Sequence, residues 1–204
     1  MPSLAWTFLV MTIMSDVIIY YFAYFWYNEK KVELMKYNYR KAILTDIDEI
    51  MIAVEDARRL LKEEGNGQWQ FGYPSRDDFI NDINNKELYV VLTPDGEIAS
   101  VCAITGYEEA YMHMYEGTWL TDYEYLVMHR VAVKEKYRGL GYGKALFEVF
   151  IEVGKSKGIK SLRIDTHKNN SLLIHLFDLY GFKYCGKAIL PPNKDRVMYE
   201  KVIE

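Results

Sequence analysis

A glycine-rich segment with a cation at each end, Arg138 to Lys144, is the part of the sequence best suited to bind an anion. It lies between an apolar, strand-like run that ends at Val133 and a helix-like run that begins at Gly141. Backbone N–H groups in such a turn can point at one anion, and the helix N-terminus adds the positive end of its dipole. The segment therefore predicts a phosphate site, although an ordinary glycine-rich turn has the same composition.

Two common phosphate-binding motifs do not fit these glycines. A dinucleotide fingerprint requires a third small residue three positions after Gly143, where this chain has Leu146. A P-loop requires glycine five residues before Gly143 and Ser or Thr after the lysine, where this chain has Arg138 and Ala145. The pattern that remains is Arg-x-x-Gly-x-Gly directly after a strand.

That pattern resembles motif A of the GNAT superfamily of N-acetyltransferases, whose loop binds the pyrophosphate of acetyl-coenzyme A (acetyl-CoA). The downstream sequence is also similar to the family: a strand is followed by Asn170, a short amphipathic helix and the pair Gly181-Phe182. The resemblance is specific over residues 128–186. It extends in element order from residue 36 to the end, and it is absent over residues 1–34.

The resemblance implies an enzyme that moves an acetyl group from acetyl-CoA directly to a primary amine of a small molecule or peptide. In the family, the strand that carries motif A splays from its neighbour, and the pantetheine arm bonds to the exposed strand backbone. A backbone N–H of this strand is also expected to stabilise the oxyanion. The resemblance implies that the donor is held by Val131, Ala132, Val133, Arg138, Gly139, Leu140, Gly141, Tyr142, Gly143, Lys144 and, through its side-chain amide, Asn170.

The general acid is where the sequence departs from the family. Many members have a tyrosine seven residues after the motif asparagine, and here that position is Phe177, which cannot donate a proton. Tyr180 lies three residues further along the same helix face and is the candidate replacement. A water molecule is the alternative.

Two residues are candidates for the general base. His129 lies on the motif-A strand, and its ordinary pKa suits proton abstraction near neutral pH. Glu124, at the start of the same strand, is the second candidate. Each also has a purely structural alternative: His129 could be a packed strand histidine, and Glu124 could be a solvent-exposed carboxylate at the edge of the sheet. Aromatic and acidic residues that would favour a cationic amine form the expected acceptor wall: Trp69, Phe71, Tyr73, Glu108, Glu109, Tyr111, Glu116, Trp119 and Asp122.

Composition limits the other possibilities. Half of the 204 residues are hydrophobic and the formal net charge is −4, which is typical of a folded chain and argues against nucleic-acid binding. The two cysteines, Cys102 and Cys185, are too few for a disulfide framework, and the four histidines show no metal-ligand spacing. We expect no metal. Two alternatives to the enzyme are a non-catalytic acyl-CoA-binding module and a protein whose membrane tether matters more than catalysis.

The periodicity predicts a single α/β (α+β) domain over residues 35–204, with a GNAT-like mixed central sheet flanked by helices. Similar proteins are often homodimers, and by analogy a homodimer is one expected state. Thr45 and Ser75 are the expected N-caps of the first two helices. The expected strands are 37–44, 87–92, 97–105, 123–133, 160–166, 184–189 and 196–203, and the expected helices are 45–64, 75–84, 141–157 and 170–180.

Residues 1–34 form a hydrophobic N-terminal extension. Between Leu4 and Tyr27 only Asp16 is charged, and such a run could span about 30 Å of hydrocarbon as a helix. A signal peptide is not indicated, because there is no basic leader or cleavage site. The open alternatives are a membrane anchor, a segment outside the functional domain, and a segment that packs on the domain or a partner. We expect a cytoplasmic protein, associated with a membrane only if residues 4–27 anchor it.

Overall fold

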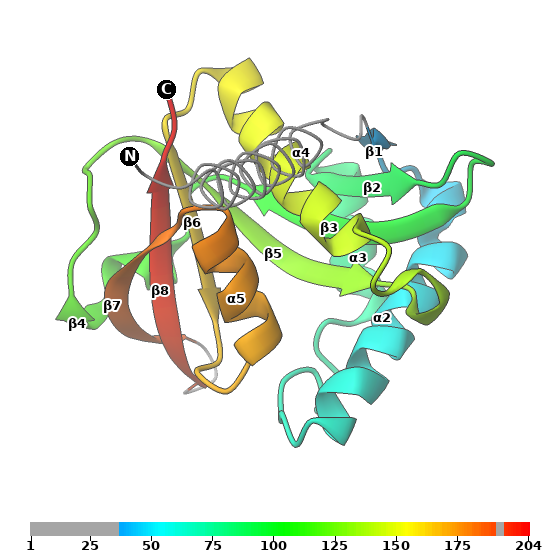
Figure 1. Cartoon of the computed structure of the whole chain (residues 1–204), viewed down its shortest axis with the longest axis horizontal. Helices are drawn as coiled ribbons and strands as arrows, with labels where there is room; N and C mark the ends of the chain where they lie inside the picture. Colours follow the sequence, from blue (N-terminus) through cyan, green and yellow to red (C-terminus); the bar gives the residue numbers. More distant parts are fainter. Residues whose placement is uncertain (1–36, 191–193) are drawn as a thin grey trace, which may run out of the picture. The chain divides into compact units, whose positions relative to one another are not determined.

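The structure, a computed structural model, describes residues 37–190 and 194–204 (Figure 1). The predicted extension over residues 1–34 lies outside this part of the chain. No helix within the described residues is long and apolar enough to cross a membrane.

One mixed sheet forms the centre of the domain, with the strand order β1-β2-β3-β5-β6-β8-β7-β4. Neighbouring strands are antiparallel except β5 and β6, which are parallel. This arrangement confirms the predicted mixed sheet in a single α/β domain. The strands are β1 (Asn38–Lys41), β2 (Leu88–Leu92), β3 (Ile98–Thr105), β4 (Met114–Gly117), β5 (Tyr125–Val133), β6 (Ser161–Thr166), β7 (Lys183–Leu190) and β8 (Lys194–Val202).

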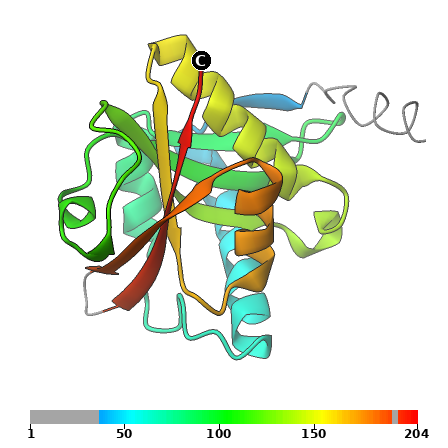
Figure 2. The same ribbon diagram turned by 60° about the vertical axis from the view of Figure 1, so that its left-hand side comes forward.

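The helices cover the two faces of the sheet, as Figures 1 and 2 show. On one face α4 and α5 bury Phe150 and Phe177 against Leu126 and Ile164. On the other face α2 and α3 pack against β2, β3 and the end of β5 in a second core. The helices are α2 (Ile47–Glu63), α3 (Arg76–Asn84), α4 (Tyr142–Lys157) and α5 (Ser171–Leu179), and the short 3-10 turns are η1 (Leu44–Asp46), η2 (Glu109–Met112) and η3 (Glu135–Tyr137).

The two predicted helix caps have different outcomes. Ser75 caps α3 as predicted, because its Oγ accepts the Asp78 N–H at 3.3 Å and the Asp78 carboxylate accepts the Ser75 N–H at 2.6 Å. Thr45 as a cap is wrong, since it lies inside η1. Asp46 stabilises the start of this helical segment instead. Its carboxylate accepts the Ile43 N–H at 2.9 Å and pairs with Arg40 at 2.6 Å.

The edge strand β4 lies inside a segment for which no strand was predicted. Three of its four residues pair with β7, and the two strands approach closely at Gly117 and Gly186. A Cβ on Gly117, whose φ is +79°, would lie 2.0 Å from the Cys185 carbonyl oxygen. Only glycine permits this pairing. The strand is short and its residues are mostly exposed, so it leaves no alternating pattern in the sequence.

Candidate active site

The only parallel strand pair among the described residues opens part of the way along its length. The pairing of β5 with β6 ends where Val127 lies opposite Arg163. Beyond that point β5 continues to Val133 with β3 as its partner, and β6 continues to Thr166 with β8 as its partner. Figure 1 shows the two strands diverging. The expected splay is therefore confirmed, and it leaves one edge of each strand without a backbone partner.

The backbone groups that face this opening can be identified from one hydrogen bond. The Lys134 N–H donates to the Ala99 carbonyl oxygen of the β3 segment at 3.0 Å. Backbone groups of successive residues in a strand point to opposite sides. Ala132 therefore also faces β3, whereas Val131 and Val133 turn their N–H and C=O groups to the opening. These are the two residues expected to bond the pantetheine arm.

A β-bulge at Arg130 changes the direction of the side chains in β5. Ala103 pairs with His129 but Val101 pairs with Ala132, so β5 contains one extra residue. Arg130 has a φ of +53°, which is unusual for a residue with a side chain. Adjacent strand residues normally point to opposite faces. Here His129 and Arg130 line the same cavity.

The glycine-rich loop presents free amides at the start of α4. The first backbone hydrogen bond of the helix runs from the Ala145 N–H to the Gly141 carbonyl oxygen. The amides of Tyr142, Gly143 and Lys144 precede it and have no acceptor within the helix. Gly141 has a φ of +93°. Gly139 has a φ of +77°, and a Cβ there would meet no atom within 4 Å. An anion can therefore approach this backbone closely.

The two cations of the loop differ in their surroundings. The Arg138 guanidinium donates to the Asp56 carbonyl oxygen of α2, which holds the loop against that helix. Lys144 is exposed at the first turn of α4. Arg138 thus has a structural bond besides its expected role at the pyrophosphate, whereas Lys144 can turn to a bound anion.

The expected contact residue and the expected acid both make bonds within the protein. The Asn170 Oδ1 atom accepts the Leu173 N–H at 3.2 Å and so caps α5. Phe177 is fully buried. The Tyr180 hydroxyl lies 3.0 Å from the Lys144 carbonyl oxygen and 3.1 Å from a Glu148 carboxylate oxygen. Burial, followed by the charge of Glu148, raises the Tyr180 pKa.

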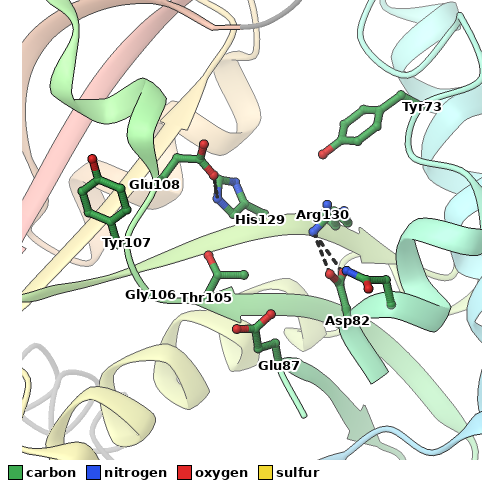
Figure 3. A pocket seen from close by; sticks show the side chains of 10 residues that line it. Tyr73, Asp82, Glu87, Thr105, Gly106, Tyr107, Glu108, His129 and Arg130 are labelled. Carbon is green, nitrogen blue, oxygen red and sulfur yellow. Dashed lines mark hydrogen bonds and ion pairs between the residues drawn. The ribbon is translucent and has the colours of Figure 1, made fainter. Parts of the chain in front are cut away.

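A cavity of about 460 Å³ lies beside the bulge. It is bounded by α3, the end of β3, the segment that follows β3, and β5, as Figure 3 shows. Most of its lining side chains are polar. They are Tyr73, Asn81, Asp82, Glu87, Thr105, Tyr107, Glu108, His129 and Arg130, with the backbone of Gly106.

His129 is the titratable group best suited to accept a proton in this cavity. Its Nε2 atom is buried without a hydrogen-bond partner among the described residues and lies 3.7 Å from a Glu108 carboxylate oxygen (Figure 3). Burial lowers the His129 pKa; the charges of Asp165 and Glu108 oppose this effect, and Arg130 reinforces it. The imidazole is therefore held neutral near pH 7.

A buried ion pair forms one end of the cavity. Arg130 Nη1 donates to both carboxylate oxygens of Asp82, at 2.9 and 3.2 Å, and the guanidinium lies 5.6 Å from the centre of the Tyr73 ring. Burial raises the pKa of Asp82 to about 6 although Arg130 opposes the shift. The sequence reasoning missed both residues. A charged residue inside the apolar run 125–133 was the available signal.

A second buried network lies next to His129. The Tyr111 hydroxyl donates to Asp165 at 2.6 Å, and Arg196 pairs with the other oxygen of this carboxylate at 3.1 Å. Tyr111 is fully buried, and its ring meets His129 edge-on at 6.1 Å. Asp165 belongs to the part of β6 that has left β5. The network therefore connects Asp165 of β6 with His129 of β5, the two strands that separate at the opening.

Only some of the remaining predicted residues are brought together at the cavity. Glu124 is exposed, precedes β5 and does not line the cavity. From the expected acceptor wall, Tyr73 and Glu108 line the cavity and Tyr111 packs beside His129. Trp119 stacks on Tyr111 at 5.4 Å. The others do not line the cavity; Phe71, for example, is 87% exposed.

Known proteins share this fold. Residues 54–182 match the model of the Acetyltransferase (GNAT) family. No curated protein matches the chain. A GNAT-family acetyltransferase from Streptococcus agalactiae is 36% identical with a TM-score of 0.76, covering 83% of this chain and 97% of that one. One from Listeria monocytogenes is 20% identical with a TM-score of 0.61, covering 82% and 95%.

A third structure includes the coenzyme. PaiA N-acetyltransferase from Thermoplasma acidophilum, solved in complex with coenzyme A, is 18% identical with a TM-score of 0.59, and the match covers 83% of this chain and 100% of that one. The splayed strands and the fold define an acetyltransferase-type α/β protein. The chain belongs to the Acetyltransferase (GNAT) family, and this membership supports acetyl transfer as its general activity.

Proposed function

We propose that this protein is an N-acetyltransferase that moves the acetyl group of acetyl-CoA directly to a primary amine. The observation that carries the proposal is the opening between β5 and β6, which has free strand backbone on one side and free helix amides at one end. A cavity with a buried histidine is lined by residues of the same strand. Family membership supports acetyl transfer in general.

The chain fits a thioester carrier that contains a diphosphate. Tyr142, Gly143 and Lys144 would bind the diphosphate through their amides, and the open space at Gly139 leaves room for it. Val131 and Val133 would bind the pantetheine arm as an added strand. When bound, acetyl-CoA supplies the activated acetyl group.

The cavity side would bind and deprotonate the amine. His129 is neutral near pH 7, its Nε2 atom has no partner among the described residues, and Glu108 lies close enough to stabilise the imidazolium that forms. The Tyr111–Asp165 pair packs against the imidazole and fixes its position. His129 is thus the proposed base. Glu124, which does not line the cavity, is not needed in this role.

One observation favours a second candidate, a non-catalytic acyl-CoA-binding module. The family's acid position holds the buried Phe177, and the Tyr180 hydroxyl is engaged with Glu148 and Lys144. Release of the thiolate would then depend on Tyr180 breaking these bonds or on water.

The two candidates are separated by measuring binding and turnover on the same protein. Thermal stabilisation by acetyl-CoA is expected for both. Release of free thiol in the presence of an amine panel is expected only for the enzyme. Stabilisation without thiol release from any amine would leave the binding module as the function, and the absence of stabilisation would exclude both.

A further inference from the structure

We propose that the acceptor is a primary amine that carries at least one further positive charge, of the alkyl diamine class. This inference rests on the proposed function, because it assigns the cavity beside His129 to the acceptor. It names the chemistry of the substrate, which family membership does not.

The charges that line the cavity do not balance. Three carboxylates, Asp82, Glu87 and Glu108, face one guanidinium, that of Arg130. Asp82 and Arg130 are joined by two hydrogen bonds and neutralise each other. The Glu87 carboxylate has no ion-pair partner among the described residues, and the neighbour of Glu108 is the neutral His129. Two negative charges are therefore left for the ligand to meet.

The reacting amine cannot meet both of these charges. It must be neutral when it attacks, so its own proton leaves for His129. A second cationic group that stays protonated is needed to compensate the other carboxylate. A monoamine would leave one carboxylate of a partly enclosed cavity without a counter-charge.

The positions of the two carboxylates fit a ligand with separated nitrogens. Glu108 lies beside His129, and Glu87 lies on the other side of Thr105 (Figure 3). The Ile104 N–H donates to the Glu87 carbonyl oxygen at 2.8 Å, and Ile104 pairs with Met128, the residue before His129. The two ends of this row are two strand spacings apart, about 10 Å between backbones. The reacting nitrogen would lie at His129 and the distal ammonium at Glu87.

Unpartnered polar atoms in the same cavity independently indicate a hydrogen-bonding ligand. The His129 Nε2 and Thr105 Oγ1 atoms are both buried without a partner among the described residues. Buried polar atoms are rarely left in this state. An amine nitrogen between the two side chains would satisfy both, with N–H groups donating to each.

The test compares three amines with the same carbon chain: putrescine, butylamine and γ-aminobutyrate. In thiol-release assays with acetyl-CoA, we expect kcat/KM for putrescine to exceed that for butylamine by about tenfold or more. One additional, partly buried ion pair contributes a difference of this size. We expect γ-aminobutyrate to be the poorest. Equal turnover of all three would overturn the inference and leave the proposed function intact. A preference for γ-aminobutyrate would instead assign Arg130 to a substrate carboxylate.

A binding measurement keeps this test independent of catalysis. With coenzyme A present, putrescine is expected to raise the melting temperature and butylamine is not. If no amine releases thiol but putrescine still stabilises the protein, the proposed function fails and the acceptor class stands. If putrescine has no more effect than butylamine, the acceptor class is wrong.

Two matched variants locate the effect. Glu87→Gln is expected to raise KM for putrescine about tenfold, to change kcat little, and to leave KM for butylamine unchanged. Glu63→Gln removes the same charge from an exposed residue at the end of α2 that does not line the cavity, and it is expected to change neither. Equal effects of the two variants would show a general charge effect and contradict the assignment of Glu87.

Discussion

Val127 of β5 lies opposite Arg163 of β6 in the last pair that joins these parallel strands. Arg163 is held at this point by its surroundings: its guanidinium lies 3.9 Å from the centre of the Tyr125 ring and 4.2 Å from that of Trp119. It also donates to the Thr121 carbonyl oxygen at 2.7 Å. The strands separate directly beyond this pair. The packed Arg163 side chain therefore marks the point at which the opening begins.

Adding one methyl group at Gly141 tests whether the glycine-rich loop binds coenzyme A. Gly141→Ala places a side chain at a φ of +93° and should destabilise the protein by about 1–2 kcal/mol. It should also weaken coenzyme A binding about tenfold or more, because the methyl enters the space before the free amides. Gly65→Ala is the matched control, since Gly65 has a φ of +68° and open space around it. It should show the same loss of stability with unchanged binding.

His129→Gln tests the proposed base. We expect kcat to fall by about 10²-fold to 10⁴-fold, while coenzyme A binding is unchanged. Burial lowers the His129 pKa, so the neutral, active form persists to lower pH than for an exposed histidine. The acidic limb of the kcat–pH profile at saturating amine should therefore lie below about 6.5, and the variant should lack this limb. A limb that survives in the variant would assign the base to another group.

Asp82 is expected to contribute a defined pH dependence to stability. Its pKa rises from 3.8 to about 6 on folding, so the folded state binds the proton more tightly than the unfolded state. The resulting stabilisation is complete below pH 3.8 and is lost as the pH rises through 6. The difference in free energy of unfolding between the wild type and Asp82→Asn should fall across this window, by at most about 3 kcal/mol. A constant difference would show that the Asp82 pKa is not raised.

Tyr180→Phe tests whether Tyr180, the acid candidate from the sequence, takes part in proton transfer. Because the hydroxyl bridges α5 to Lys144 and Glu148 of α4, we expect the variant to lose about 1 kcal/mol of stability. We expect kcat to stay within about threefold of the wild type, with water completing the proton transfer. A decrease in kcat of about 10²-fold or more, at unchanged coenzyme A binding, would establish Tyr180 as the acid.

The donor side of the site was predictable because it depends on local sequence. A glycine-rich turn between a strand and a helix determines where the amides of residues 142–144 point. The strand and helix that follow were found from their periodicity, within a few residues of their ends.

The acceptor side was not predictable, because it depends on contacts distant in sequence. Asp82 and Arg130 are brought together by the packing of α3 on the sheet. The bulge at Arg130, which turns two successive side chains into one cavity, has no glycine to mark it. Glu87 directly precedes β2 and Glu108 follows β3, and both line the cavity beside His129 of β5.

The central claim is that the open edge of β5 and the first amides of α4 hold the acyl donor. Its most direct test is a titration of the full chain with coenzyme A, followed by the backbone amide signals in NMR spectra. We expect the largest shifts at Val131, Val133 and residues 139–144. Binding that leaves these amides unchanged, or shifts confined to another part of the fold, would contradict the account.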